Sequence, residues 1–241
     1  MLWMHYSNEG GQVLVATATF IVILLLAIVV VGDIGETIVS RIQLQNASDA
    51  GALAGATVLK IAMDCLALSN SIVCSFYIGP LFKLPLCIEL AFAVAGIQDI
   101  VIELAPYLSV IVAVSVAQSN GADMAFVYND IIDPTAIPSL MVQRKGRIGK
   151  IFPGLIVDHY KRTKDKPYGD RFIRLVALKA KKDSQVGSEF SSDIKSIPHM
   201  KAVSEAATYG GTLNPLYRFI KKYKERLVPV SLKILELEFN H

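Results

Sequence analysis

The strongest pattern in the chain is an apolar run near its N-terminus. Residues 13–32 read VLVATATFIVILLLAIVVVG, with no charge and no proline, and Thr17 and Thr19 are the only polar side chains among them. A helix of that length spans about 30 Å, the thickness of the hydrocarbon core of a bilayer. We therefore predict a single transmembrane anchor here. Side chains that would meet lipid include Val13, Phe20, Leu25, Leu26 and Val31.

A cleaved signal peptide is the alternative for this run. Signal peptides carry basic residues ahead of an apolar stretch of roughly 7–15 residues. Here the stretch is longer, and neither Lys nor Arg precedes it. These features favour a retained anchor, and the short N-terminal tail is expected to stay in the cytoplasm.

Helical spacing continues beyond the apolar run. Ile34, Ile38 and Ile42 recur every four residues, and no proline occurs before Pro80. Such spacing is typical of an amphipathic helix. We predict that the membrane helix continues as a long amphipathic helix until Gly79-Pro80.

A second helix is predicted from Leu86 to Ser119, where Asn120-Gly121 would end it. Pro106 is expected to kink or split it. The stretch Leu104–Ala117 is apolar but short for a bilayer, and we interpret it as a buried helix packing on the first. A second membrane pass is the alternative.

After residue 120 the pattern changes to short runs with β character. Two helical pieces are predicted between them, at His199–Thr208 and Leu216–Arg226. The predicted fold class is therefore α+β, with a transmembrane helix, a helical hairpin and a small mixed extracytoplasmic domain. The expected divisions are residues 1–32, 33–120 and 121–241. The strand candidates are Met124–Ile132, Phe172–Leu178 and Val228–Phe239.

Charge divides the chain into two halves. Residues 1–140 carry 3 Lys/Arg and 11 Asp/Glu, whereas residues 141–241 carry 21 Lys/Arg and 10 Asp/Glu. The basic half could face anionic lipid, an acidic partner or nucleic acid, or form a solvated surface, which we favour. Its basic clusters lack the regular aromatic interleaving of a base-stacking surface, so we expect no nucleic-acid partner.

Few residues suggest chemistry. A hairpin turn near residues 79–85 would bring Cys74 and Cys87 close enough for a possible disulfide, and small buried side chains are the alternative interpretation. The four histidines are scattered, with no metal-ligand spacing. We predict no catalytic, cofactor-binding or metal site, and no small-molecule substrate is indicated.

The N-terminal segment carries a longer motif. Gly11 precedes the apolar run, Asp33, Gly35 and Arg41 follow it, and then comes LQNASDAGALAGA at Leu44–Ala56, here called the signature segment. This arrangement resembles the N-terminal signature of the TadE/TadG-like proteins of the tight-adherence (Flp) pilus system. Two later segments also resemble the family. One is Ala117–Val127, and the other is Lys201–Val230, which contains AVSEA at Ala202–Ala206 and RLVPV at Arg226–Val230.

Two features depart from relatives of this family. Relatives cleaved by a prepilin peptidase carry Glu five residues after the cleaved glycine, where this chain has Val15 or Ala16. Longer members carry a metal-binding Asp-x-Ser-x-Ser motif, which this sequence lacks. We therefore expect the N-terminus to remain unprocessed and no metal domain to be present.

The resemblance implies a structural, non-enzymatic protein of the bacterial inner membrane. Its partners would be the lipid bilayer and other subunits of a membrane or pilus assembly. Ala52, Gly55 and Ala56 form a face with little bulk that would allow close helix packing, within the chain or against another subunit. The alternatives are an accessory single-pass subunit of another membrane complex and an envelope enzyme whose site is not recognisable.

Overall fold

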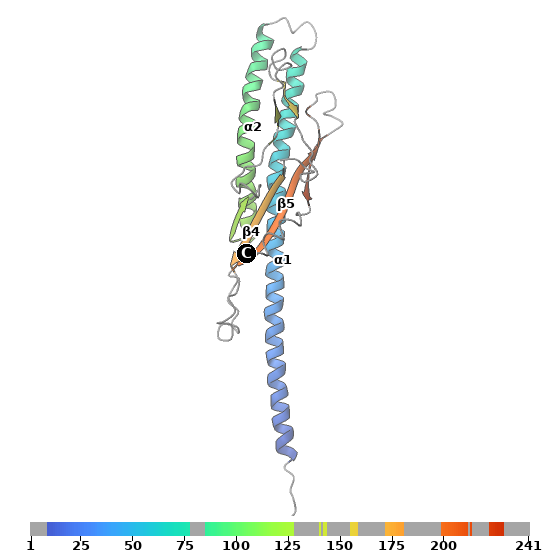
Figure 1. The fold of residues 1–241 in the computed structure, drawn as a ribbon, viewed down its shortest axis with the longest axis vertical. Helices are drawn as coiled ribbons and strands as arrows, with labels where there is room; N and C mark the ends of the chain where they lie inside the picture. The colour runs from blue at the N-terminus through green and yellow to red at the C-terminus, as the bar shows by residue number, and fades with distance from the viewer. Residues whose placement is uncertain are drawn as a thin grey trace, which may run out of the picture. The chain divides into compact units, whose positions relative to one another are not determined.

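The computed structural model describes residues 9–77, 85–127, 140, 142–143, 155–158, 172–180, 199–211, 213 and 222–228. The chain divides into two compact units, one of residues 1–42 with 181–198 and one of residues 43–180 with 199–241. Figure 1 shows the helices and strands of both units.

The described part of the first unit is helical. It belongs to α1 (Glu9–Tyr77), whose residues 13–32 are all exposed. Thr17 and Thr19 donate hydrogen bonds of 2.8 Å to the carbonyls of Val13 and Val15. Their hydroxyls are therefore satisfied within the helix, as an apolar environment requires.

The second unit contains two antiparallel helices. Residues 43–77 of α1 lie beside α2 (Pro85–Ser119), because Gly55 lies near Ser109 and Gln98 bonds to Ser69. The long first helix is confirmed, and it ends before Gly79-Pro80. Pro106 lies inside α2, which continues through it, so the predicted splitting is wrong.

The predicted stop at Asn120-Gly121 is confirmed. Gly121 has a φ of 100°, a conformation that glycine adopts without steric cost. The amides of Asn120 and Ala122 donate to Ala117 O, both at 3.2 Å. These bonds satisfy the last turn of α2 and lead the chain into the first strand.

Four strands form an antiparallel sheet in the order β1-β4-β5-β6. In register, Ala177 faces Ala125 on one side and Ala202 on the other. A separate two-stranded sheet pairs β2 (Val142–Gln143) with β3 (Val157–Asp158). The strands of the main sheet are β1 (Met124–Val127), β4 (Phe172–Ala180), β5 (His199–Gly210) and β6 (Tyr223–Val228).

The strand predictions differ in outcome. The strand at Phe172–Leu178 is confirmed as β4, and Met124–Ile132 contains β1, with residues 128–132 outside the described residues. Of Val228–Phe239 only Val228 is described, as the end of β6.

Both predicted helices in the C-terminal half are wrong where they can be compared. His199–Thr208 lies in β5, and residues 223–226 of Leu216–Arg226 lie in β6. Helix propensity is a weak preference that tertiary pairing overrides. In β5 the small residues Ala202, Ser204 and Ala206 alternate on one face of the sheet.

The sheet packs on the helices through that face. The buried core shared by the helices and the sheet includes Leu44, Leu59, Met63, Ile173, Leu175, Ala202 and Ala206. The α+β class is thus confirmed. The expected divisions at residues 32 and 120 remain predictions.

Candidate functional site

One face of the signature segment on α1 lies at the centre of this core. Its buried positions follow one another at spacings of three and four residues, the period of a helix face. Every side chain on that face is small except Leu44, so neighbouring backbones can approach closely. The buried residues are Leu44, Ala47, Ser48, Gly51, Ala52, Gly55 and Ala56.

Gly55 lies where α1, α2 and β4 meet. A Cβ built on Gly55 would lie 2.9 Å from Ser109 O and 3.0 Å from Ala113 Cβ, and it would also collide with the Ile173 side chain. Real Cβ atoms do not approach other atoms so closely. Glycine is therefore required here for the observed packing.

Gly51, one turn earlier, has the same role. A Cβ there would lie 2.6 Å from Ala113 O and 2.9 Å from Ala117 Cβ, and it would meet the Leu175 side chain. The two glycines together let α2 and β4 contact the same face of α1.

Polar residues of the signature segment bond directly to the sheet. Ser48 donates to the carbonyl of Leu175 on β4 at 3.3 Å. Gln45 donates to Ser204 on β5 at 3.0 Å and to Asp49 at 2.9 Å, and Ser204 donates in turn to Asp49. These directional bonds fix the register between the helix face and strands that lie more than 120 residues later in the chain.

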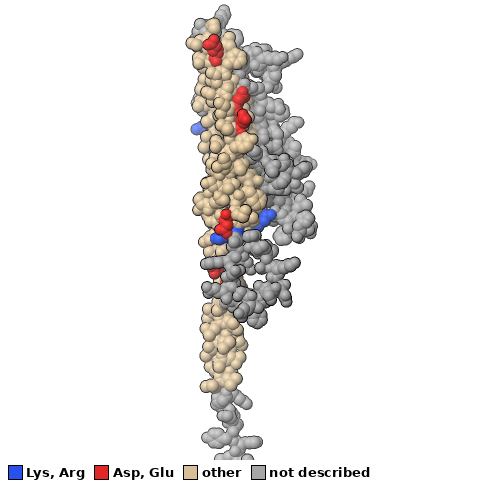
Figure 2. Space-filling model, turned by 90° about the vertical axis from the view of Figure 1, so that its left-hand side faces the viewer, with Lys and Arg blue, Asp and Glu red and all other residues tan. Residues whose placement is uncertain are grey.

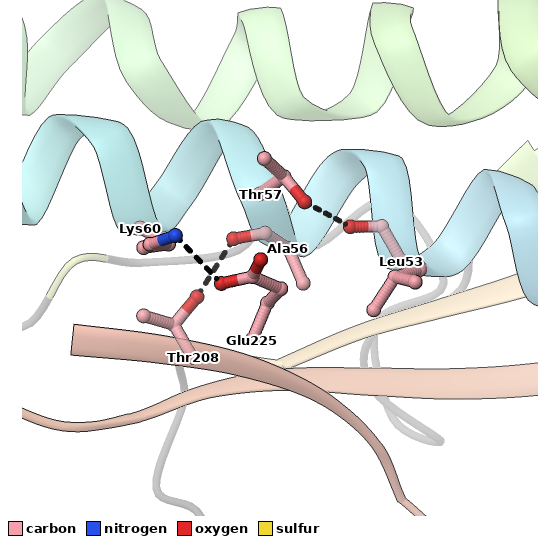
Figure 3. Close-up of polar contacts among 6 residues, drawn as sticks. All are labelled: Leu53, Ala56, Thr57, Lys60, Thr208 and Glu225. Carbon is pink, nitrogen blue, oxygen red and sulfur yellow. Dashed lines mark hydrogen bonds and ion pairs between the residues drawn. The ribbon is translucent and has the colours of Figure 1, made fainter.

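Figure 3 shows the next turn of the same interface. Thr208 of β5 donates to Ala56 O at 2.8 Å, and Lys60 forms an ion pair of 3.0 Å with Glu225 of β6. Thr57 instead bonds within α1, to Leu53 O at 2.8 Å. The helix is thus held to three consecutive strands of the sheet, β4, β5 and β6.

A second polar cluster lies further along the two helices. The Asn70 amide donates to Ile156 O at 2.8 Å and to Leu213 O at 2.9 Å, and it accepts from Ile156 N at 3.0 Å. Gln98 of α2 donates to Ser69 at 2.8 Å. Asn70 therefore ties two irregular segments of the chain to α1, at a buried position where unpaired amides would be costly.

A buried ion pair joins β4 to β5. Arg174 and Glu205 face each other in register, and both are 7% exposed. Burial raises the pKa of Glu205 above its ordinary value, while the charge and hydrogen bond of Arg174 act in the opposite direction. At the more exposed Glu225, the hydrogen bond from Lys60 lowers the pKa.

The structure places the predicted site residues in three groups. Ala52, Gly55 and Ala56 are buried within the chain's own core, and packing of this face against another subunit stays a prediction. The predicted lipid-facing residues are exposed on α1. Cys74 and Cys87 are free and half-buried, so their disulfide stays a prediction and neither is a fully buried small residue.

The described residues show an interface and no assembled reactive centre. No group of three or more His, Cys, Asp or Glu residues able to hold a metal occurs within the part of the chain that the structure describes. The arrangement can hold a sheet against two helices.

Sequence reasoning missed several contributors to this interface. Gly51 lies four residues before Gly55, and that spacing could have identified it. Ser48, Asp49 and Gln45 gave no such signal, because their partners on the sheet are distant in the sequence.

Comparisons with known proteins bear on this same segment. No curated protein and no solved structure matches the chain. Two helices among the described residues, α1 and α2, are long and apolar enough to cross a membrane, by length and composition. Residues 11–58, which contain the whole signature segment, match the family model described as putative Flp pilus-assembly TadE/G-like, and the predicted resemblance is confirmed over that range.

Proposed function

We propose that this chain is a membrane-anchored structural protein of a tight-adherence pilus assembly. The observation that carries the proposal is that the segment matched by the family model, residues 11–58, has two structural roles. Its first part is an exposed apolar helix, and its second part is the buried face that holds α2 and the sheet.

The apolar part is suited to anchoring. Fourteen of residues 13–32 are Val, Leu, Ile or Phe. Each contributes roughly 0.3–0.6 kcal/mol to insertion at the middle of a bilayer, which amounts to about 4–8 kcal/mol for the segment. All twenty residues are exposed, so no described residue of the same unit covers them. A lipid bilayer is the environment that would cover them.

The second part is suited to holding a folded body at the end of an anchor. Tight packing at Gly51 and Gly55, with hydrogen bonds to β4 and β5, joins the sheet to α1. The anchor and the interface with the sheet thus belong to one continuous helix. We place the chain in the bacterial inner membrane with its N-terminus in the cytoplasm and the helical hairpin and sheet outside.

The matched family is a pilus-assembly family and not an enzyme family. On this proposal the chain works through packing and display, and its partners are lipid and other assembly subunits.

Deletion and complementation in the bacterium that carries the gene would test the proposal. Loss of the chain should abolish surface pili seen by electron microscopy, and the wild-type gene should restore them. Gly96→Ala is the matched control for Gly55→Ala, since a Cβ at Gly96 meets nothing within 4 Å. Gly96→Ala should restore pili fully and Gly55→Ala less. Normal pili in the deletion strain would overturn the proposal. If the chain is found in the membrane fraction of the wild type in that case, an accessory subunit of another membrane complex would be favoured.

A further inference from the structure

The side of α2 turned away from the core carries a regular apolar seam. Starting at Leu86, apolar residues recur at alternating steps of four and three positions over more than three heptads. The α2 seam consists of Leu86, Leu90, Ala93, Ile97, Ile100, Leu104, Tyr107 and Ile111. Alternating steps of four and three are the a and d positions of a coiled coil.

The α2 seam is exposed. Its large side chains are between 42% and 63% accessible, with the whole chain taken into account. Figure 2 views the molecule from the side on which α2 lies, and uncharged residues dominate there, with a few acidic and a few basic ones. The buried positions of α2 that face α1, such as Ala105, Ser109 and Ala113, lie on the other side of the helix. The helix thus has one packed face and one apolar face without a neighbour among the described residues.

The charged residues beside the α2 seam indicate which kind of helix can bind it. In the heptad frame, Glu89 and Glu103 occupy g positions beside the seam, and the opposite e positions are Val94, Val101 and Leu108. The helix carries no Lys or Arg from residue 85 to 119. Residues at e and g decide which helices pair in a coiled coil.

A second copy of α2 fits poorly. In a parallel pair, g positions face e positions of the partner, so Glu89 and Glu103 would each meet an apolar side chain. In an antiparallel pair, g positions face g positions, so Glu89 and Glu103 would meet each other, Gly96 or Val110. Neither arrangement gives these carboxylates a cation, so neither gains the ion pairs at e and g that select coiled-coil partners.

We propose that the α2 seam binds a helix from another subunit that has its own apolar heptad seam and Lys or Arg at the flanking positions. This inference rests on the proposed function and names the chemistry of the partner. Apolar contact would supply the attraction, and pairing with Glu89 and Glu103 would set which helix is accepted.

Designed peptides give a direct test with the full chain in lipid nanodiscs. The probe is a helix about four heptads long, with Leu and Ile at a and d and Lys at e and g. The comparison peptide is identical except for Glu at e and g. The basic peptide should bind at least about tenfold more tightly than the acidic one.

Two exposed apolar residues on α2 provide matched variants. Ile100 is 57% exposed and lies in the seam, whereas Phe92 is 59% exposed and lies outside it. Ile100→Ser should weaken binding of the basic peptide by about tenfold, and Phe92→Ser should change it by less than about twofold. Glu103→Lys should reduce the preference for the basic peptide. Circular dichroism on each variant shows whether the fold is retained.

Three results would overturn the inference. The first is equal binding of both peptides, and the second is binding of neither. The third is self-association of the wild type that Ile100→Ser abolishes while the basic peptide fails to bind, which would assign the seam to a second copy. The pilus assay does not use the peptides. If the deletion strain has normal pili and the chain still binds the basic peptide selectively, the pilus role is rejected and the inference about the α2 seam stands.

Discussion

The hydroxyl of Thr208 on β5 donates a buried hydrogen bond to the carbonyl of Ala56 on α1, at 2.8 Å and across 152 residues of sequence. The acceptor lies in the signature segment, one residue after Gly55. Close packing at Gly55 brings the strands near, and the hydroxyl of Thr208 fixes their position along the helix.

Thr208→Val tests that bond. Valine keeps the shape of threonine and favours a strand, but it cannot donate, so the free energy of unfolding should fall by about 1 kcal/mol. Urea unfolding of the detergent-solubilised chain, followed by circular dichroism, measures the change. Thr57→Val is the control, because Thr57 bonds only within α1 and its loss should cost a few tenths of a kcal/mol. Equal effects of the two variants would show that the bond to β5 has no special importance.

Gly55→Ala tests close packing. The added Cβ would meet Ser109 O and Ala113 Cβ at about 3 Å, and such overpacking typically costs about 1–3 kcal/mol. Gly96→Ala places the same methyl group in open space within a helix and should stabilise the chain by about 0.5–1 kcal/mol. The same unfolding assay compares them. If Gly55→Ala also stabilises, α2 and β4 move apart at no cost and the packing argument fails.

Replacing Leu25 and Leu26 with Arg tests the anchor. Each arginine at mid-span costs about 2.5–3.5 kcal/mol on insertion scales, so two would cancel most of the estimated gain. The variant should leave the membrane pellet after carbonate extraction or be degraded. Replacement of both residues with Val should leave the chain in the pellet. Normal retention of the Arg variant would contradict a single anchor at residues 13–32.

The pH dependence of stability should report Glu205. Burial raises its pKa above 4.5, so the folded state holds this proton more tightly than the unfolded state. The stabilising contribution is therefore present below pH 4.5 and is lost as pH rises through the raised pKa. Glu205→Gln cannot titrate and should lack this fall.

Thermal unfolding from about pH 4 to 7 compares the wild type with Glu205→Gln. Glu225 acts in the opposite direction, because its lowered pKa gives a contribution that is lost as pH falls below 4.5. Its exposure to solvent makes that contribution small. If Tm changes with pH at the same rate above pH 4.5 in the wild type and in Glu205→Gln, a raised pKa at Glu205 is contradicted.

The sequence by itself determined the features that depend on local periodicity. The apolar run at residues 13–32, the continuous α1, the end of α2 at Asn120-Gly121 and the small-residue face at Gly55 all follow from helix geometry and turn chemistry. The α2 seam was also present as a heptad pattern in the sequence. Only the structure showed which face of α2 the core leaves exposed.

Tertiary structure decided what local preference could not. Ala202–Ala206 favours a helix by composition, yet it forms part of β5, because pairing with β4 and β6 and close contact with α1 outweigh propensities of a few tenths of a kcal/mol per residue. Gln45 and Ser48 donate hydrogen bonds to the sheet and Ala56 O accepts one from it, and each of these bonds joins residues more than 120 positions apart. No local pattern specifies such pairs, because their energy arises only when folding brings the two surfaces together.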